Sequence, residues 1–450
     1  MNEHGDLKRL LNLWHIVIIG LGYMAPTIVF DTFGIVSEET NGHVPAAYLF
    51  ATLAILFTAS SYRKMVVAFP TAGSAYTYTG KSLHPSTGFL VGWMVLLDYI
   101  FTPMINALIS SIYATTIFPN FPSWLWIISF IAIITLVNIF SVKISVSINT
   151  LFVLFQSLVA CVFIILSIKE LLQVEGTSHL FSLHPFYTAN MEMSSLLNGA
   201  AILCFSFLGF DSVTTLAEET NDPKKTISRA IFLIVMIGGI LFITASYFAQ
   251  SLLPLFPDIR NIEGTSSEMA FHMGGILFQS ILFAASLTST IASGIVSQIS
   301  ASRLLYAMGK DNVIPRKIFS YVHPRFGTPI INIILIGIVA LTAIFLNLAT
   351  ATSFITFGAL TAFTFVNISV FSHYFIRKKM RNLKSTVTYL VSPFIGTTLL
   401  VFLWINLKLS AIMLGLAWGL LGAIYLFVSK KSEKEVPKID FGGITEDQIK

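Results

Sequence analysis

The apolar run from Leu10 to Val36 limits the possible folds of this chain more than any other feature of its sequence. A run of this length is typical of a helix that crosses a membrane. Gly20, Gly22 and Pro26 interrupt it, and proline lacks a backbone N–H while its ring collides with the preceding turn. Because unpaired backbone groups cannot face lipid, a break at this depth must be buried in protein or line a cavity. We therefore predict an all-helical membrane protein whose first helix is broken.

A second interruption, Phe-Ser-Phe-Leu-Gly-Phe-Asp at residues 205–211, falls within a later apolar run. Broken helices in corresponding positions of the two halves of a chain are the best sequence indication of a transporter's binding site. The two interruptions therefore favour a carrier whose substrate binds where the breaks meet.

The composition supports a membrane protein. Apolar residues form 55% of the chain and charged residues only 11%, whereas about a quarter of the residues in a soluble domain are charged. The mean hydropathy of +0.80 leaves no room for a sizeable water-soluble domain. The net charge of +5 comes from basic residues in short loops between apolar runs, so it does not indicate a nucleic-acid partner.

Other chemical classes find no support in the sequence. Cys161 and Cys204 both lie in apolar runs, which argues against a disulfide framework. No group of His and Cys has the spacing of a metal site, and no phosphate loop of the GxxxxGK[ST] type occurs. We therefore expect no cofactor, no ATP-driven transport and no enzyme activity.

Apolar runs separated by polar loops predict twelve membrane segments. They span residues 12–36 (broken), 45–65, 87–115, 123–141, 147–168, 195–217 (broken), 229–253, 273–306, 328–347, 352–376, 387–406 and 410–429. A broken helix opens the first five segments, and another opens the next five. The predicted organisation is an N-terminus (1–11), a ten-helix core (12–376), two trailing helices (377–429) and a charged tail (430–450), with a short surface helix within residues 69–85.

The basic residues predict the orientation of the chain. With this segmentation, all 27 lysines and arginines except Lys169, Arg260 and Lys408 lie on the same side as the N-terminus. Cytoplasmic loops carry the excess of positive charge in membrane proteins. We therefore predict that both termini are cytoplasmic and that the chain lies in the cytoplasmic (inner) membrane.

Three acids lie well inside the predicted segments, namely Asp31, Asp98 and Asp211, and no Lys or Arg lies deep enough to pair with them. An unpaired charge at this depth costs ~3 kcal/mol or more, so it usually marks a substrate pathway, a partner or a proton relay. The predicted interior is net negative. It therefore suits a cationic substrate, or protons.

Each acid has two interpretations. Asp98, roughly 16 Å into its helix, either holds an ammonium or a proton while Tyr99 shapes the cavity, or bonds a neighbouring helix while Tyr99 only packs. Asp211 either faces a substrate amine or caps the half-helix that follows the break. Asp31 either binds the distal amine of a diamine or provides a charge at the entrance, or it is only stabilised by the dipole of a half-helix N-terminus.

Five sequence stretches carry a family resemblance. They are GLGYMAPTIVFDTFGIVSEETNGHVPAAY from Gly20, FPTAGSAYTY from Phe69, GFLVGWMVLLDYIFTPMIN from Gly88, ILCFSFLGFDSVTTLAEETNDPKKTISRAI from Ile202 and SRLLYAMGKDNVIP from Ser302. Over roughly residues 13–428 the chain resembles the amino acid–polyamine–organocation (APC) superfamily, and within it is similar to bacterial putrescine importers. The resemblance implies a LeuT-like fold, with a five-plus-five inverted repeat, broken helices 1 and 6, and two trailing helices.

The resemblance also implies roles for single residues. Related polyamine and arginine carriers have an acid at the position of Asp211 and an aromatic gate at that of Phe205. Related amino-acid carriers use an unwound backbone at the positions of Gly20 and Gly22 to receive the substrate carboxylate. Tyr23 replaces a small residue that many of those carriers have, which favours a substrate with amines alone.

The coupling ion follows from weaker signals. The region of the fifth segment that holds a lysine in sodium-independent relatives offers Gln156 here. Ser289 and Thr290 are candidates for a sodium site, but such hydroxyls also bond within their own helix. We prefer proton coupling. Glu218 and Glu219, at the inner end of the sixth segment, are expected to cap a helix or to pair with Lys224, Lys225 or Arg229, rather than to touch the substrate.

The sequence thus predicts a secondary transporter that imports putrescine or a similar small amine by alternating access. Helices 1, 2, 6 and 7 would rock against the remaining helices around a midplane site. The alternative is an amino-acid permease of the same superfamily, in which the Gly20–Gly22 backbone binds a carboxylate.

Overall fold

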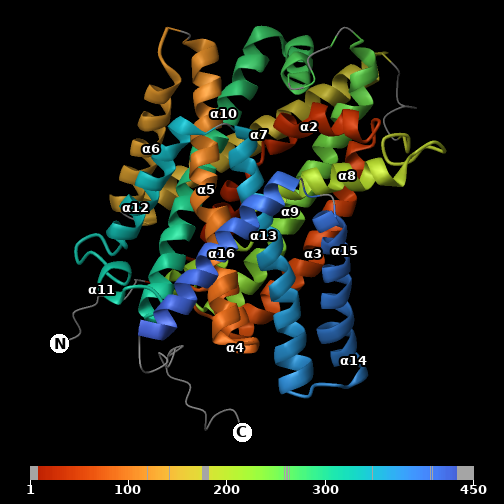
Figure 1. Cartoon of the computed structure of the whole chain (residues 1–450). Coiled ribbons are helices and arrows are strands. Elements are labelled where there is room, and N and C mark those ends of the chain that lie inside the picture. Colours follow the sequence, from red (N-terminus) through yellow and green to blue (C-terminus); the bar gives the residue numbers. More distant parts are fainter. Residues whose placement is uncertain are drawn as a thin grey trace.

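The computed structural model describes residues 9–432, apart from residues 119, 141, 175–181, 258, 260, 261, 263, 347, 406 and 408. Within this part the elements are helices, in the arrangement of Figure 1. The longer ones are α1 (Leu13–Met24), α2 (Ile28–Glu39), α3 (Val44–Ala68), α5 (Pro85–Ile117), α6 (Ser123–Phe140), α7 (Val142–Val174), α8 (Met193–Leu203), α9 (Pro223–Leu252), α10 (Thr265–Lys310), α12 (Ile330–Ala340), α13 (Leu348–Val370), α15 (Ser392–Ile405) and α16 (Leu409–Ser432).

The helices have the length and composition of membrane spans. Ten spans of the described chain are long and apolar enough to cross a membrane, and the pair α1 and α2, bent by 41° at its break, makes up to eleven. Residues 330–345, which comprise α12 and a 3-10 turn, form a shorter apolar helix. The prediction of an all-helical, multi-pass membrane protein is confirmed, while the count of twelve stays a prediction.

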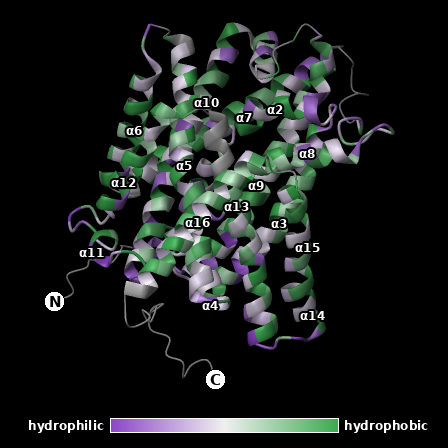
Figure 2. Ribbon diagram, viewed as in Figure 1, coloured by the Kyte–Doolittle hydropathy of each residue, from purple (hydrophilic) through white to green (hydrophobic). Residues whose placement is uncertain are grey.

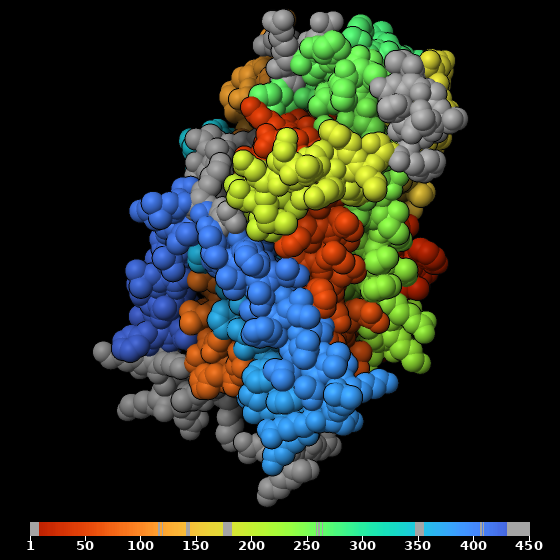
Figure 3. Space-filling view, turned by 90° about the vertical axis from the view of Figure 1, so that its right-hand side faces the viewer, coloured from red at the N-terminus to blue at the C-terminus, as the bar shows by residue number. Residues whose placement is uncertain are grey.

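The outside of the bundle is apolar. Large hydrophobic side chains such as Ile133 of α6, Leu151 of α7 and Ile338 of α12 are each more than half exposed, and Figure 2 shows hydrophobic residues along these helices. Figure 3 shows the face on which α8, in yellow-green, lies across α3 beside α15. Lipid chains can cover such a surface without any polar partner.

The first membrane helix breaks at residues 25–27. Ala25 ends α1 in the left-handed region, with a φ of 56°, and Pro26 and Thr27 precede α2. Gly20 and Gly22 are buried inside α1. The prediction that the helix unwinds at these two glycines is therefore wrong, because α1 continues through them and breaks only at residues 25–27. The proline, which cannot donate a helical hydrogen bond, sets the break instead.

The glycines of α1 serve close packing. A Cβ on Gly20 would collide with the side chain of Ile234 in α9, and one on Gly22 would collide with Asn149 in α7. The Asn149 amide also donates to the backbone oxygen of Ile18, at 3.1 Å. These two glycines therefore let α7 and α9 approach α1 closely.

The break in the sixth membrane helix is present where the sequence predicts it. α8 ends at Leu203 and continues into the 3-10 turn η2 (Cys204–Phe207). Gly209 then has a φ of 97°, and a second 3-10 stretch, η3 (Ser212–Glu219), follows. A φ of this sign suits glycine, because it has no Cβ. The turn directs Asp211 into the interior.

The helix α4 (Ser74–Ser82) lies in the predicted loop at 69–85, but it is not a surface helix. All its residues except Lys81 are buried, and it packs against α5 and α13. The close contact with α5 depends on Gly88 and Gly92, where a Cβ would meet the backbone of Gly80 and the side chain of Tyr76. The prediction of a surface position is wrong because these small residues admit α4 into the bundle.

Just after α10, Asp311 binds α4. Its Oδ2 accepts a hydrogen bond from the Tyr76 hydroxyl, at 2.9 Å. Burial raises the pKa of Asp311 to about 6, against the opposing effects of the Tyr76 hydrogen bond and the charges of Lys81 and Lys310. The folded protein thus binds this proton more tightly than the unfolded chain, so the stability that Asp311 contributes is complete below pH 4 and is lost as the pH rises through 6.

We expect Asp311→Asn to raise the Tm of the purified protein by about 2 °C at pH 8 and to change it little at pH 4.5. Asparagine keeps an oxygen that accepts the Tyr76 hydrogen bond and carries no charge to bury. Thermal unfolding in detergent at both pH values measures the difference. An equal change at both pH values would show that burial of the Asp311 charge has no part in it.

Candidate functional site

Two carboxylates and three tyrosines meet beside the two helix breaks. Asp98 of α5 and Asp211, which follows the second break, are each only 1% exposed. The hydroxyls of Tyr99 and Tyr62 both donate to Oδ2 of Asp211, at 2.7 and 3.4 Å. The Tyr23 hydroxyl donates to Oδ1 of Asp98, at 3.1 Å. Residues from α1, α3, α5 and the sixth-helix break thus form one buried polar cluster, which we call the diacid site.

Contacts between α1 and α5, and others within α5, position the residues around the two acids. The rings of Tyr23 and Tyr99 meet edge to face, with centroids 6.2 Å apart. The Thr102 hydroxyl donates to the backbone oxygen of Asp98 at 2.7 Å and lies 3.2 Å from its Oδ1. Asp98 and Tyr99 leave α5 in different directions, as neighbours on a helix must. Each nevertheless contributes to the diacid site, Asp98 directly and Tyr99 through Asp211.

Asp211 has a carboxylate oxygen that accepts no hydrogen bond from the described residues. Oδ1 of Asp211 is buried and has no hydrogen-bond partner among the described residues. Although Asp211 directly precedes η3, in the N-cap position, its side chain makes no capping hydrogen bond, so the interpretation as a helix cap is wrong. The ion pairs of the described chain are Lys225–Asp222, Arg303–Glu219 and Lys310–Glu218. None of them neutralises Asp98 or Asp211.

Aromatic rings and α13 close the site on one side. The ring of Tyr62 contacts those of Phe210, at 5.5 Å, and Phe363 of α13, at 6.1 Å. Gly358 of α13 lies so close to α5 that a Cβ there would meet the backbone nitrogen of Asp98 at 3.2 Å. The carboxylates are therefore shielded from lipid by protein. A carboxylate in such surroundings attracts a cation far more strongly than one in water does.

Gly209 packs directly against the ring of Tyr23 in the diacid site. A Cβ at this position would collide with the ring of Tyr23. We expect Gly209→Ala to displace Tyr23 from Asp98, to lower uptake of the transported substrate more than protein level, and to add backbone strain of about 1–2 kcal/mol. Gly327→Ala is the matched control, because Gly327 has a φ of 66° but open space around it. Equal uptake in both variants would contradict the positioning of Tyr23 by Gly209.

Asp31 lies in α2 and belongs to a different set of contacts. Its Oδ1 accepts hydrogen bonds from Ser286 of α10, at 2.9 Å, and from Tyr113 of α5, at 3.2 Å. It shares no hydrogen-bond partner with Asp98 or Asp211 among the described residues. Asp31 is thus fixed between three helices beyond the first break. Its assignment to the substrate stays a prediction.

Phe205 and the hydroxyls of α10 also keep their predicted functions only as hypotheses. Phe205 is half-buried in η2, next to Ser206, whose Oγ lies 3.3 Å from the Tyr48 hydroxyl. The Thr290 hydroxyl donates to the Leu287 oxygen in its own helix, at 2.8 Å. Ser289 is buried beside it. The Thr290 hydroxyl therefore bonds within its own helix, which is the alternative to a sodium site that the sequence left open.

The sequence missed Tyr62 and Thr102 of the diacid site. Both lie inside apolar helices, where a hydroxyl requires a partner. In the sequence, the only indication for Tyr62 and Thr102 was that a hydroxyl inside an apolar helix needs a hydrogen-bond partner. Which acid satisfies it depends on how α3 and α5 pack, and that information is not local to either helix.

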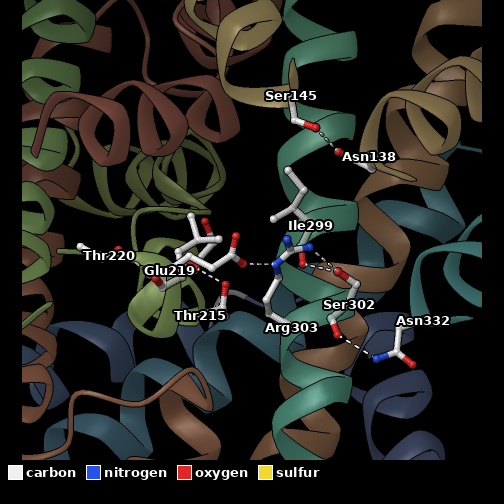
Figure 4. Close-up of polar contacts among 11 residues, drawn as sticks. Asn138, Ser145, Thr215, Glu219, Thr220, Ile299, Ser302, Arg303 and Asn332 are labelled. Carbon is white, nitrogen blue, oxygen red and sulfur yellow. Dashed lines mark hydrogen bonds and ion pairs between the residues drawn. The ribbon is translucent and has the colours of Figure 1, made fainter. Parts of the chain in front are cut away.

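A buried ion pair lies near the end of the sixth helix, away from the diacid site. Arg303 of α10 has no exposed surface, and its Nε donates to Oε1 of Glu219 at 2.7 Å. Figure 4 shows the two side chains pointing toward each other from η3 and α10. The Arg303 Nη1 donates to the Ser302 hydroxyl, at 3.0 Å. Glu218 pairs at the surface with Lys310, at 3.3 Å.

These pairs correct two predictions. Glu218 and Glu219 bind residues of α10 rather than Lys224, Lys225 or Arg229, because η3 packs against α10 while the sequence neighbours turn outward. Lys225 instead pairs with Asp222, at 3.5 Å. An arginine does lie in the interior, contrary to expectation. It compensates Glu219 and leaves the diacid site without a positive partner among the residues that the structure describes.

The residues before α1 form backbone hydrogen bonds with the end of η3, next to this ion pair. The backbone N–H groups of Leu10 and Leu11 donate to the oxygen of Glu219, at 2.9 and 3.0 Å, and the N–H of Asn221 donates to the oxygen of Leu11, at 3.0 Å. Leu11 itself is buried. The start of the first helix and the end of the sixth are therefore held together.

An all-helical, multi-pass membrane protein with two interrupted helices around buried acids has the architecture of a secondary transporter. The chain belongs to the amino acid permease family, whose model matches residues 15–429. This family has the LeuT type of fold, as the sequence predicts, and its members are transporters rather than enzymes.

Three relatives indicate the range of the family. The low-affinity putrescine importer PlaP of Escherichia coli (strain K12) is 44% identical over 437 residues, which cover 97% of each chain. The branched-chain amino acid permease BcaP of Bacillus subtilis (strain 168) is 25% identical over 95% of each chain. The human cationic amino acid transporter 4 is 28% identical over 81% of this chain and 60% of its own.

Proposed function

We propose that the chain imports putrescine or a similar small amine across the cytoplasmic membrane. The observation that supports this most directly is the diacid site, where two buried carboxylates have no basic partner in the described chain and Oδ1 of Asp211 is unbonded. A primary ammonium has three donors and one positive charge. It matches both the free oxygen and the excess negative charge.

The relatives and the aromatic lining support the same substrate. The relative that shares 44% identity over nearly the whole chain is a putrescine importer. Tyr62, Tyr99 and Phe210 surround Asp211 with rings, and an aromatic face attracts a desolvated ammonium by ~2 kcal/mol or more. A diamine uses such contacts at both ends of the molecule.

The alternative, an amino-acid substrate, needs a partner for its carboxylate. The sequence offered the backbone of Gly20 and Gly22 for this purpose. In the structure these residues continue the helix α1, so their N–H groups take part in helical hydrogen bonding. The carboxylate of an amino acid would be a third negative group beside Asp98 and Asp211 and would be repelled by them. Both points favour an amine without a carboxylate.

The transport cycle that we propose is alternating access with proton coupling. α1–α2, α3, α8–η3 and α9 would move against the other helices, with the diacid site at the centre. Asp31, Asp98 and Asp211 are the candidate proton carriers. We propose that both termini face the cytoplasm, in agreement with the distribution of lysine and arginine along the chain.

Uptake into sealed proteoliposomes tests this proposal. We expect labelled putrescine to accumulate when an inward proton gradient is imposed, and unlabelled putrescine to compete better than arginine or leucine. Inhibition by leucine alone would reject the diamine substrate. Accumulation of putrescine driven by a sodium gradient but not by a proton gradient would reject proton coupling. A gradient-free vesicle preparation is the control for binding without transport.

A further inference from the structure

An apolar groove lies among α5, α10, α12 and α16, and none of its lining residues belongs to the diacid site. It has a volume of about 290 Å³, close to the lower end of the ~300–1,000 Å³ that is usual for ligand pockets. Trp93 of α5, Leu335 and Val339 of α12, and Trp418 of α16 form its sides. Phe319 of the short helix α11 (Arg316–Phe319) also lines it.

The described lining residues offer no polar group to an occupant. The indole Nε1 of Trp93 donates to the oxygen of Trp418, at 3.0 Å, and that of Trp418 donates to the oxygen of Trp93, at 2.8 Å. The two rings stack with centroids 4.9 Å apart. The hydroxyl of Tyr425, another lining residue, donates to the Val313 oxygen, at 3.3 Å. Only apolar faces remain, so the occupant's buried part is a hydrocarbon.

The rim at α11 is positively charged. Arg316 and Lys317 follow directly after the lining residue Pro315, and both are exposed. Neither forms an ion pair with any described residue. Figure 1 shows α11 at the end of the bundle beside α12, with α16 crossing nearby. A hydrocarbon slot with a basic rim between membrane helices is the arrangement that binds an anionic phospholipid.

We propose that this groove holds one acyl chain of an anionic phospholipid whose headgroup lies against Arg316 and Lys317. The lipid comes from the surrounding membrane, because the groove lies among helices that are apolar on their outer sides. Its occupant would join α12 and α16 to α5, the helix that carries Asp98. The site is independent of the substrate proposed above.

Native mass spectrometry of the delipidated, purified full chain tests whether the groove prefers a lipid with an anionic headgroup. The probes are palmitoyl-oleoyl phosphatidylglycerol and the phosphatidylcholine with the same chains. We expect phosphatidylglycerol to be retained, and Arg316→Ala/Lys317→Ala to lower its affinity by about fivefold or more. Lys224→Ala/Arg229→Ala, which removes two exposed charges elsewhere, should change nothing. Equal retention of both lipids by the unmodified protein would overturn the proposal.

A second pair of variants tests the groove. Leu335→Trp fills it and should abolish retention of phosphatidylglycerol. Ile338→Trp adds the same ring to the same helix at a residue that is 59% exposed and outside the lining, and should leave retention unchanged. Size-exclusion chromatography confirms that both variants are folded. Unchanged lipid binding in Leu335→Trp would show that the groove does not hold the lipid. A dimer that only this variant disrupts would show that the groove binds a second copy of the chain instead of a lipid.

Discussion

Asp211→Asn is expected to reduce the initial rate of putrescine uptake by about 10–100-fold while the amount of protein in the membrane stays near that of the wild type. The substitution keeps the shape of the side chain and removes its charge. A hydrogen bond to a charged group contributes about 1.5–3 kcal/mol, and 1.4 kcal/mol corresponds to a factor of ten. Labelled putrescine uptake, normalised to protein level by immunoblot, measures the effect.

Two comparisons make this test specific. Asp98→Asn should also reduce uptake, because Asp98 supplies the second buried charge of the diacid site. Asp311→Asn is the matched control, since it makes the same chemical change in a carboxyl that bonds Tyr76 after α10, and its uptake should remain near that of the wild type. Wild-type uptake in both Asp98→Asn and Asp211→Asn would mean that the substrate is not recognised by these charges.

Arg303→Met should produce the largest loss of stability. The arginine is fully buried and pairs with Glu219, so the substitution leaves a buried, uncompensated carboxylate. Breaking one side of a buried pair costs about 3–5 kcal/mol. We expect a much lower Tm in detergent and less protein in the membrane. Lys310→Met, which removes the partner of Glu218 at an exposed position, should cost ~1 kcal/mol or less.

The double variant Glu219→Gln/Arg303→Met separates charge from packing. It removes both charges, so most of the lost stability should return if the uncompensated carboxylate is the cause. The backbone oxygen of Glu219, which binds Leu10 and Leu11, is unaffected by either substitution. A double variant as unstable as Arg303→Met alone would show that the arginine acts through packing instead.

The membrane architecture and the second break follow from local features. Long apolar runs require helices in lipid, and Gly209 between Leu208 and Phe210 indicates the interruption in the sixth helix. The sequence also identified Asp98, Tyr99 and Asp211 as buried candidates, because charge and hydroxyls are rare at that depth. These conclusions needed only the properties of residues near one another in the chain.

Other features depended on contacts between distant segments. The sequence suggested unwinding at Gly20 and Gly22, whereas packing against Ile234 and Asn149 is what uses them. It placed a short surface helix within residues 69–85, although α5 and α13 bury the helix α4 that forms there. It paired Glu219 with neighbours in the chain rather than with Arg303.

The sequence by itself therefore determined that this is an all-helical membrane protein with buried acids and interrupted helices, because hydropathy, proline and glycine act locally on the backbone. Only the tertiary structure decided which hydroxyls reach Asp98 and Asp211, that Oδ1 of Asp211 is unbonded among the described residues, and that Arg303 neutralises Glu219. Hydrogen bonds and ion pairs act over about 3 Å. Residues separated by many positions come within that distance only once the helices have packed.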